Sequence, residues 1–484
     1  MKYDNIGRPA HQRVRNNERT LLDKSYLWGD NLRLLQALDT INHRSVRYDY
    51  DTFGSLSGAV YGDGSRQWRN PDAMGNVYDS PDRTDRSYGR GGQLREDKKW
   101  RYYYDSHGNL VLKTMRRSGP SLETGMRDEF LAWQSGDYAY TWQGNGMLRS
   151  VTRPDGKTLT FKYDALGRRI EKVFDGRVYR YLWDGDVILH EWDYTEADRP
   201  NTIVTETGEV TLDRSEPVEN LIMWVYDSDS YVPTAKIVGE RHYSIISDYI
   251  GRPVQAYDDN GNIVWQADYD IYGNLRNLHG SRQFIPFRQL GQYEDDETRL
   301  YYNRFRYYDP RNGNYISQDP IGLMGNNPTL YGYVGDLNNW ADVFGLRCKK
   351  VKKIGPSIPE FHRKNFTDGI VNMRQVSGDE IFYKYHGKSN RLGREYNYVT
   401  NKKYLSEQAL REDLALLKEW GVEIEYVTTF KPQAGTWIGE GTAAKQISQD
   451  GTEILEGTGY QGIINIKELP NSTIIKTEKV KFSL

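Results

Sequence analysis

The sequence predicts a repeated, antiparallel all-β domain over residues 1–346, followed by a small α+β domain over the rest of the chain. One short phrase recurs through the first part, and the composition is polar and rich in tyrosine, with 38 Tyr and a mean hydropathy of −0.80. Residues 1–346 carry 43 basic against 50 acidic side chains, whereas residues 347–484 carry 22 against 17. Segments of such different composition and charge are expected to fold as separate units.

The recurring phrase predicts a strand, a tight turn and a second strand. Its copies are RYDYDTFGSL from Arg47, RYYYDSHGNL from Arg101, FKYDALGRRI from Phe161 and ADYDIYGNL from Ala267. In each copy tyrosine alternates with other residues before an Asp-x-x-Gly turn, where Gly supplies a positive φ and Asp caps the turn. Because a lone hairpin is not stable, the hairpins are expected to stack into one long sheet.

This phrase resembles the YD repeat of Rhs proteins and of the C subunits of insecticidal toxin complexes. The stretch from residue 248, DYIGRPVQAYDDNGNIVWQADYDIYGNL, to WADVFGL at residue 346 is similar to the Rhs-associated core that closes such shells. The resemblance implies a β-shell of repeats over residues 1–247, a core over 248–346, and a C-terminal toxin that the shell encapsulates. Family shells carry many more repeats, so these residues are expected to form only a fraction of a shell.

The same resemblance implies self-cleavage. Family members cut themselves after the Leu of a terminal DPxGL-like motif, with aspartates that work as in an aspartyl protease. The candidates here are Asp319 in DPIGL and Asp342 in DVFGL, with the cut after Leu346. Two neighbouring carboxyl groups do not both ionise easily, so one can act as an acid while the other activates water. Val343 departs from the family, which usually has Pro at this position.

After residue 346 the repeat stops, and a basic linker over residues 347–375 precedes a toxin domain over 376–484. Strands are expected at 380–387, 392–400, 423–430, 456–466 and 473–482. A helix is expected over 406–421, with Ser406 as N-cap and Gly421 just past its end. The glycine-rich segment 434–446 is expected to be irregular.

Common catalytic templates are absent from this domain, which has no P-loop, no HExxH and no cysteine pair. The only histidines of residues 347–484 are His362 and His386, so a metal nuclease is disfavoured and no metal site is predicted. Cys348 is the single cysteine of the chain, which excludes an intramolecular disulfide.

The remaining motifs are FYKYHG, GREYNYVT, a helix, a strand ending in KP, GEGTAAKQ and GTGYQG. In this order they resemble the ADP-ribosyltransferase-like fold of NAD-consuming toxins, including Tre-type Rhs effectors and the tuberculosis-necrotizing-toxin group. The resemblance implies NAD as the substrate. It places Gln461 in the block where Gln replaces the usual catalytic Glu.

The implied task is to hold NAD bent and to stabilise the cationic ribosyl group that forms as nicotinamide departs. The expected NAD-binding residues are Lys384, Arg394, Tyr398, Thr400 and Gly459, and His386 is a further candidate on the first strand. Gln461 can accept a hydrogen bond from the ribose 2′-OH, but its amide does not titrate and so cannot be a general base. Glu440 is the carboxylate available if an acceptor must be activated. Ordinary structural roles stay open for each of these residues.

Four functions remain open from the sequence. The leading one is an antibacterial ADP-ribosyltransferase that modifies an intracellular target such as a component of translation. The second is an NAD glycohydrolase, towards which Gln at position 461 points, and the third is a ribonuclease that uses His386 with cationic partners. The fourth is an inactive structural relic.

Export is expected to depend on other proteins, because the chain has no apolar run of 18 residues and no signal-peptide pattern. The expected route is type VI secretion through a spike or chaperone that this sequence does not contain. The expected partners are an immunity protein and an intracellular protein or RNA target. The toxin would be made in the bacterial cytoplasm and would act in the cytoplasm of a target cell.

Overall fold

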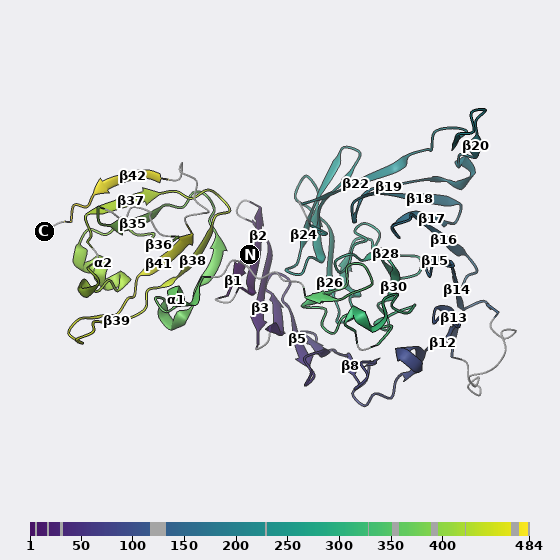
Figure 1. The fold of residues 1–484 in the computed structure, drawn as a ribbon, viewed down its shortest axis with the longest axis horizontal. Coiled ribbons are helices and arrows are strands. Elements are labelled where there is room, and N and C mark those ends of the chain that lie inside the picture. The colour runs from purple at the N-terminus through teal and green to yellow at the C-terminus, as the bar shows by residue number, and fades with distance from the viewer. Residues whose placement is uncertain are drawn as a thin grey trace. The chain divides into compact units, whose positions relative to one another are not determined.

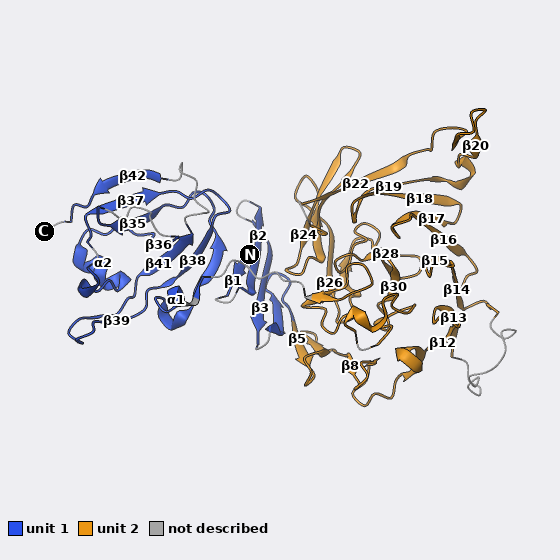
Figure 2. Ribbon diagram, in the orientation of Figure 1, with its two compact units in different colours: residues 1–45, 352–484 blue, residues 46–351 orange. Residues whose placement is uncertain are grey.

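The computed structural model describes residues 1–4, 7–16, 19–29, 32–116, 132–227, 230–327, 329–350, 358–388, 395–421, 423–465 and 474–482. The chain divides into two compact units: residues 46–351, and residues 1–45 together with 352–484 (Figure 2). The boundaries predicted at residues 247, 346 and 375 stay a prediction. The two compact units differ from these predicted boundaries chiefly because residues 1–45 belong to the same unit as the C-terminal segment.

The unit of residues 46–351 is dominated by one long antiparallel sheet, as the repeat predicts. Sixteen strands form it among the described residues, each paired with the next one along it (Figure 1). They are β10 (Ser87–Tyr88), β11 (Leu94–Glu96), β12 (Trp100–Tyr104), β13 (Leu110–Met115), β14 (Tyr138–Trp142), β15 (Leu148–Thr152), β16 (Thr158–Tyr163), β17 (Arg169–Phe174), β18 (Arg177–Asp184), β19 (Val187–Thr195), β22 (Glu219–Tyr226), β23 (Pro233–Val238), β24 (Arg241–Ser247), β25 (Pro253–Tyr257), β26 (Ile263–Tyr269) and β27 (Leu275–His279).

Shorter hairpins precede and decorate this sheet. The strands β5 (Arg44–Tyr50), β6 (Leu56–Tyr61) and β7 (Arg66–Trp68) pair in succession. Two-stranded ladders join β8 (Asn70–Pro71) to β9 (Val77–Tyr78), and β20 (Thr202–Val204) to β21 (Val210–Leu212).

The repeat turns have the predicted geometry. In the turn from Asp164 to Arg168, Oδ1 of Asp164 accepts hydrogen bonds from the N–H groups of Leu166 and Arg168, both at 2.9 Å. Gly167 has φ 73° and donates its N–H to the carbonyl of Asp164. A Cβ at Gly167 would also lie 2.6 Å from the ring of Phe305, so glycine is needed here both for its backbone conformation and for close packing.

A second, smaller sheet fills the concave side of the long one (Figure 1). Its strands are β28 (Tyr293–Asp295), β29 (Leu300–Asn303), β30 (Arg306–Asp309) and β31 (Asn314–Tyr315), and every residue in them is buried. Tyrosine suits this core because the ring is apolar while the hydroxyl still finds an acceptor. Tyr302 donates to the carbonyl of Gly167, for example, and Tyr301 to that of Gly273, so the inner sheet binds the repeat turns directly.

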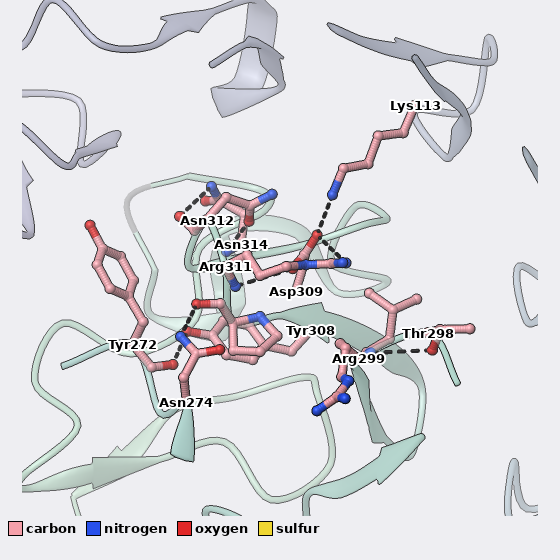
Figure 3. Close-up of polar contacts among 12 residues, drawn as sticks. Lys113, Tyr272, Asn274, Thr298, Arg299, Tyr308, Asp309, Arg311, Asn312 and Asn314 are labelled. Atoms are coloured by element: carbon pink, nitrogen blue, oxygen red, sulfur yellow. Dashed lines mark hydrogen bonds and ion pairs between the residues drawn. The ribbon is translucent and has the colours of Figure 1, made fainter. Parts of the chain in front are cut away.

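Charged side chains join the two sheets as well. In Figure 3, Asp309 of β30 lies between Lys113 of β13 and Arg311, at 3.0 Å from Nζ and 2.6 Å from Nε respectively. Burial lowers the pKa of Lys113 to about 8. Although burial opposes ionisation of Asp309, the charges of Arg311 and Lys113 hold the pKa of its carboxyl well below the usual range. Each buried charge therefore has a partner of opposite sign, as burial requires.

The other unit holds two antiparallel sheets with little helix. The first sheet contains, in spatial order, β36 (Tyr396–Val399), β41 (Tyr460–Asn465), β38 (Trp437–Thr442), β34 (Asn372–Gln375), β1 (Lys2–Tyr3), β2 (Pro9–Asn16), β3 (Arg19–Trp28) and β4 (Leu34–Asp39). The second contains β35 (Phe382–His386), β37 (Tyr426–Phe430) and β42 (Ile474–Lys479). Phe382 and Phe430 of the second sheet share a buried cluster with Ile438 and Ile464 of the first. The remaining elements are α1 (Glu360–Arg363), α2 (Glu407–Leu414), β39 (Gln446–Ile447) and β40 (Ile454–Leu455).

The expectation of an irregular segment at 434–446 is wrong, because β38 is an internal strand that pairs with β34 and β41. Its glycines reflect crowding, not flexibility. A Cβ at Gly439 would lie 2.8 Å from Val371 and 3.0 Å from both Ile358 and Ile463.

The helix expected over 406–421 is shorter than predicted. Its N-cap is confirmed, since the Ser406 side chain accepts a hydrogen bond from the N–H of Ala409. The helix ends at Leu414, because Ala415 adopts a left-handed conformation with φ 50°. This turn lets Ala415 and Leu417 pack against Leu455 in a small cluster of their own.

Candidate functional sites

The first candidate site surrounds the peptide bond between Leu346 and Arg347. Oδ1 of Asp342, which follows β32 (Trp340–Ala341), accepts hydrogen bonds from the N–H of Leu346 at 2.9 Å and from that of Arg347 at 3.1 Å. The other carboxylate oxygen accepts a hydrogen bond from the hydroxyl of Tyr315 at 2.9 Å. Asp342 is fully buried, and its hydrogen bond from the N–H of Arg347 places its carboxylate against the nitrogen side of this bond.

Asp319 approaches the carbonyl side of the same bond. A Cβ atom on Gly325, in the turn Gly322–Gly325, would lie 2.5 Å from both Oδ2 of Asp319 and the carbonyl oxygen of Leu346. Oδ2 of Asp319 and the carbonyl oxygen of Leu346 are therefore separated by at most twice 2.5 Å. Oδ1 of Asp319 accepts a hydrogen bond from the N–H of Ile321 at 3.0 Å.

Arg306 of β30 connects the two carboxyl groups. One of its terminal nitrogens lies 2.9 Å from Oδ2 of Asp319 and 3.1 Å from Oδ2 of Asp342, and its guanidinium stacks on the ring of Tyr315 at 3.7 Å. Its Nε donates to the carbonyl of Gly345. Burial raises the pKa of Asp319, and the charge of Arg306 offsets part of this rise. The structure therefore presents one carboxyl group that resists ionisation beside another that several donors surround.

All three residues predicted for this site, Asp319, Asp342 and Leu346, come together. The sequence analysis did not identify Arg306, Tyr315 or Asn303, whose side-chain amide donates to the hydroxyl of Tyr315 and to the carbonyl of Asp342. They lie in a tyrosine-rich run in which nothing distinguishes them from residues of the core. Cys348 is close by, but burial raises the pKa of its thiol to about 11, so the neutral thiol predominates.

The second candidate site is a cavity of about 290 Å³ in the unit that contains the C-terminal segment. Four predicted NAD-site residues line it: Lys384, Tyr398, Thr400 and Gln461. They come from three strands, β35, β36 and β41, together with the residue that follows β36. The lining is rich in tyrosine and side-chain amides, and none of the described residues that line it is acidic. This volume is at the lower end of the range of small-molecule sites.

A hydrogen-bonded network joins α1 and the residues after it to strands that line this cavity. Tyr398 Oη lies 2.7 Å from Nδ1 of His362 and accepts a hydrogen bond from the Asn365 amide at 2.6 Å. The Gln461 amide donates to the carbonyl of Asn365 at 3.0 Å. Burial lowers the pKa of His362 and raises that of Tyr398, so both side chains are held neutral near pH 7. The segment around α1 thus fixes Tyr398 and Gln461, a role that the sequence analysis did not assign to it.

Lys384 and Thr400 have partners inside the cavity wall. The Lys384 ammonium donates to the side-chain carbonyl of Asn397. Thr400 exchanges two backbone hydrogen bonds with Tyr383, which ties the two sheets together at this point.

The other predicted residues lie elsewhere. His386 is buried between Thr428 and the carbonyl of Gly387, with contacts of 2.8 and 2.7 Å, and does not line the cavity. The Glu440 carboxylate is bound by Arg374 at 2.9 Å and by the Tyr460 hydroxyl at 3.0 Å. Gly459 packs against Asp413, to whose carbonyl it donates its N–H. Arg394, which is predicted to bind NAD, lies outside the described residues.

The parts of the chain that the structure describes contain no group of three or more His, Cys, Asp or Glu arranged to hold a metal ion. Within the same residues, no helix combines the length and apolar character needed to cross a membrane.

Comparison with known proteins places these sites in context. The sequence model of the teneurin YD-shell matches residues 1–329. The double-stranded DNA deaminase toxin A of Burkholderia cenocepacia is 30% identical over 375 residues, which cover 71% of this chain and 24% of that protein. The "Probable deoxyribonuclease RhsA" of Dickeya dadantii is 31% identical over 268 residues, covering 53% of this chain and 16% of that protein.

Among solved structures, the TcdB2-TccC3-TEV crystal structure matches 70% of this chain and 19% of its own, with 16% identity and a TM-score of 0.39. The chain thus spans about a quarter or less of the length of these proteins. The matched family region ends before Asp342 and before the C-terminal cavity.

Proposed function

Because the chain belongs to the YD-shell family of Rhs-type polymorphic toxins, we propose that it cuts itself between Leu346 and Arg347 to sever a C-terminal toxin domain from its shell. The observation that supports this proposal best is the placement of two carboxyl groups on opposite sides of one peptide bond, with Asp342 at its nitrogen and Asp319 near its carbonyl oxygen.

The proposed reaction is a hydrolysis with water as the second reactant. Asp319, whose protonated form burial favours, donates a hydrogen bond to the carbonyl oxygen of Leu346 and polarises the carbonyl. The carboxylate of Asp342 takes a proton from the water that attacks the carbonyl carbon and passes a proton to the nitrogen of Arg347 as the C–N bond breaks. The products are a carboxylate at Leu346 and an amine at Arg347.

The test is the mass of the purified chain and the N-terminal sequence of any fragment. Wild type should yield a fragment that begins at Arg347, and Asp342→Asn and Asp319→Asn should leave the chain intact. Asp175→Asn is a matched control, because this exposed aspartate has φ 50° and asparagine tolerates that conformation. Cleavage elsewhere, or undiminished cleavage in both site variants, would exclude the proposed mechanism.

For the C-terminal domain we propose NAD as the substrate, and glycohydrolysis in preference to ADP-ribosyl transfer. The support is that Lys384, Tyr398, Thr400 and Gln461 line one cavity of about 290 Å³. Transfer to a protein or RNA acceptor calls for a base, and the candidate carboxylate of Glu440 is outside the cavity and bound by Arg374 and Tyr460. The cavity offers Gln461 to the ribose and aromatic rings to nicotinamide.

A nuclease is the second candidate. Two relatives are named for activity on DNA, one as a deaminase and one as a deoxyribonuclease, and residues 347–484 carry a net positive charge. His362 and Lys384 line the same cavity and could serve phosphodiester cleavage.

Expression of the full chain in bacteria separates these candidates. If intracellular NAD collapses, and Gln461→Ala prevents this collapse while Glu440→Gln does not, the activity is glycohydrolysis. Growth arrest with intact NAD and tagged ADP-ribose on a target indicates transfer, and arrest with degraded nucleic acid and intact NAD indicates a nuclease. Normal growth together with stable NAD would refute an NAD-consuming toxin and favour a structural relic.

As part of the same proposal, the chain acts between bacteria. It is made in the cytoplasm, delivered through a secretion spike of type VI and active in the cytoplasm of a target cell. A cognate immunity protein that covers the cavity would protect the producer.

A further inference from the structure

The edge of β34 carries a strand from the opposite end of the sequence. The first sheet runs β36–β41–β38–β34–β1, so β1 covers the side of β34 that β38 leaves open. Lys2 pairs with Arg374 and Tyr3 with Met373 in an antiparallel ladder. An uncovered edge of this kind presents unpaired N–H and C=O groups, which an added extended strand satisfies.

The Tyr3 side chain adds apolar contact to this ladder. Its ring meets that of Trp437 edge to face at 5.4 Å. Tyr3 also packs against a buried cluster that includes Phe366, Met373 and Ile463, all from the C-terminal segment. Aromatic pairs of this geometry contribute about 0.5–1.5 kcal/mol beyond the area that they bury.

The ladder between β1 and β34 joins the start of the chain to its C-terminal segment. Residues 1–45 belong to the same compact unit as residues 352–484, but they are covalently continuous with residue 46 of the shell. A cut after Leu346 breaks the covalent link between shell and C-terminal segment while β1 stays on β34. A second short ladder, Trp340 to Lys350 and Ala341 to Lys349, also spans the cut.

We infer that the outer edge of β34 is a strand-docking surface, occupied by β1, that retains the C-terminal domain on the shell after the chain is cut. The inference rests on the proposed cleavage for its biological role, but the docking itself does not require it. Release of the domain then requires the removal of β1 from β34, so cleavage is necessary and not sufficient.

The test isolates β1 by cutting the full chain beyond β33 (Lys349–Lys350). A site for a sequence-specific protease is inserted within residues 351–357, with Asp342→Asn to suppress self-cleavage. The cut leaves the ladder of Trp340 and Lys350 entirely within the N-terminal fragment, so that ladder does not hold the C-terminal fragment. Native size-exclusion chromatography then follows whether the two fragments elute together, and dilution gives their rate of separation.

We expect the cut chain to elute as one species and Tyr3→Pro, which removes both a ladder N–H and the ring, to dissociate at least about tenfold faster. Tyr3→Phe should behave as the parent, and so should Leu27→Ala, which changes an exposed side chain of β3 in the same segment. Immediate separation of the parent fragments would overturn the inference, as would an unchanged rate in Tyr3→Pro. Absence of self-cleavage in wild type would refute the proposed function alone, because the inserted site cuts regardless.

Discussion

The backbone N–H of Arg347 donates to Oδ1 of Asp342 across 3.1 Å, while the hydroxyl of Tyr315 donates to Oδ2 of the same carboxylate across 2.9 Å. Tyr315 therefore holds the Asp342 carboxylate in its orientation toward the peptide bond. Removal of a hydrogen bond to a charged group costs about 1.5–3 kcal/mol, and about 1.4 kcal/mol corresponds to tenfold in rate.

Tyr315→Phe is accordingly expected to slow self-cleavage about 10- to 100-fold. The rate is measured by gel densitometry of freshly refolded chain. Tyr308→Phe is the matched control, because Tyr308 is buried with its ring centre 5.9 Å from that of Tyr315, while its hydroxyl donates to the carbonyl of Tyr272 and not to Asp342. Equal rates in the two variants would show that the Tyr315 hydroxyl does not act on Asp342.

Self-cleavage should depend on pH through Asp319. Burial raises the pKa of this carboxyl above its ordinary value of 3.8, with Arg306 opposing. Because the proposed acid is the protonated form, the cleavage rate should fall as pH rises through the folded-state pKa of Asp319. Ionisation also disfavours the folded state, so this group's contribution to stability is present below pH 3.8 and is lost as pH rises through the raised pKa.

The measurement is the rate of cleavage against pH, with tryptophan fluorescence at each pH to show that the fold persists. A rate that rises with pH over the same interval would contradict the assignment of Asp319 as the acid.

Arg169 should be essential to the stability of the shell unit. It occupies the position of Leu56 and Leu110 in the repeat, yet its guanidinium is fully buried and lies 2.6 Å from Oδ2 of Asp295 on the inner sheet. Without Arg169, Asp295 would stay buried with Lys172 at 3.7 Å as its remaining ion-pair partner, and removal of one member of a buried pair costs about 3–5 kcal/mol. Arg169→Met is therefore expected to lower the free energy of unfolding by about that amount in urea denaturation. Arg149→Ala, at an exposed position of β15 in the same sheet, should change it by less than about 0.5 kcal/mol.

The sequence predicts the shell better than the C-terminal domain for a physical reason. Every repeat combines an alternating strand with an Asp-x-x-Gly turn, so local chemistry alone sets the hairpins, as Asp164 and Gly167 illustrate. Arg169 shows the limit. Nothing local distinguishes a buried arginine from an exposed one, because its partner Asp295 is 126 residues away.

The candidate sites show the same division. Asp319, Asp342 and Leu346 stand in short motifs that a resemblance can identify, and the fold brings them together. Arg306, His362 and Asn365 act through tertiary contacts alone. The prediction of an irregular segment at 434–446 is wrong because it took glycine as typical of loops, whereas Gly439 and Gly441 allow close packing inside a sheet.

Gly439→Ala tests this last explanation. The added methyl would lie 2.8 Å from Val371 and 3.0 Å from Ile358 and Ile463, none of which can move without disturbing the core. Overpacking of this kind costs about 1–3 kcal/mol, to be measured as a lower midpoint in chemical denaturation. Gly451→Ala has an open environment but φ 72°, so it should show only a backbone penalty of about 1 kcal/mol. A Gly439→Ala chain as stable as wild type would mean that β38 tolerates a side chain there.

The hydrogen-bonded network that lines the cavity should control NAD consumption by holding the Gln461 amide in position. The Tyr398 hydroxyl is 2.7 Å from His362 and accepts from Asn365 at 2.6 Å, and the Asn365 carbonyl in turn holds Gln461 at 3.0 Å. Tyr398→Phe keeps the ring but frees α1 and, with it, the Gln461 amide. Since a displacement of about 1 Å can cost about 100-fold in rate, we expect NAD turnover by the full chain to fall 10- to 100-fold.

Tyr426→Phe is the matched control, because Tyr426 stacks on His386 away from the cavity. The readout is the initial rate of NAD loss, followed by chromatography of the products, beside Gln461→Ala. If Gln461→Ala abolishes turnover and Tyr398→Phe retains the wild-type rate, the amide is positioned by the sheet alone. If all three variants match wild type, the cavity is not where NAD is consumed.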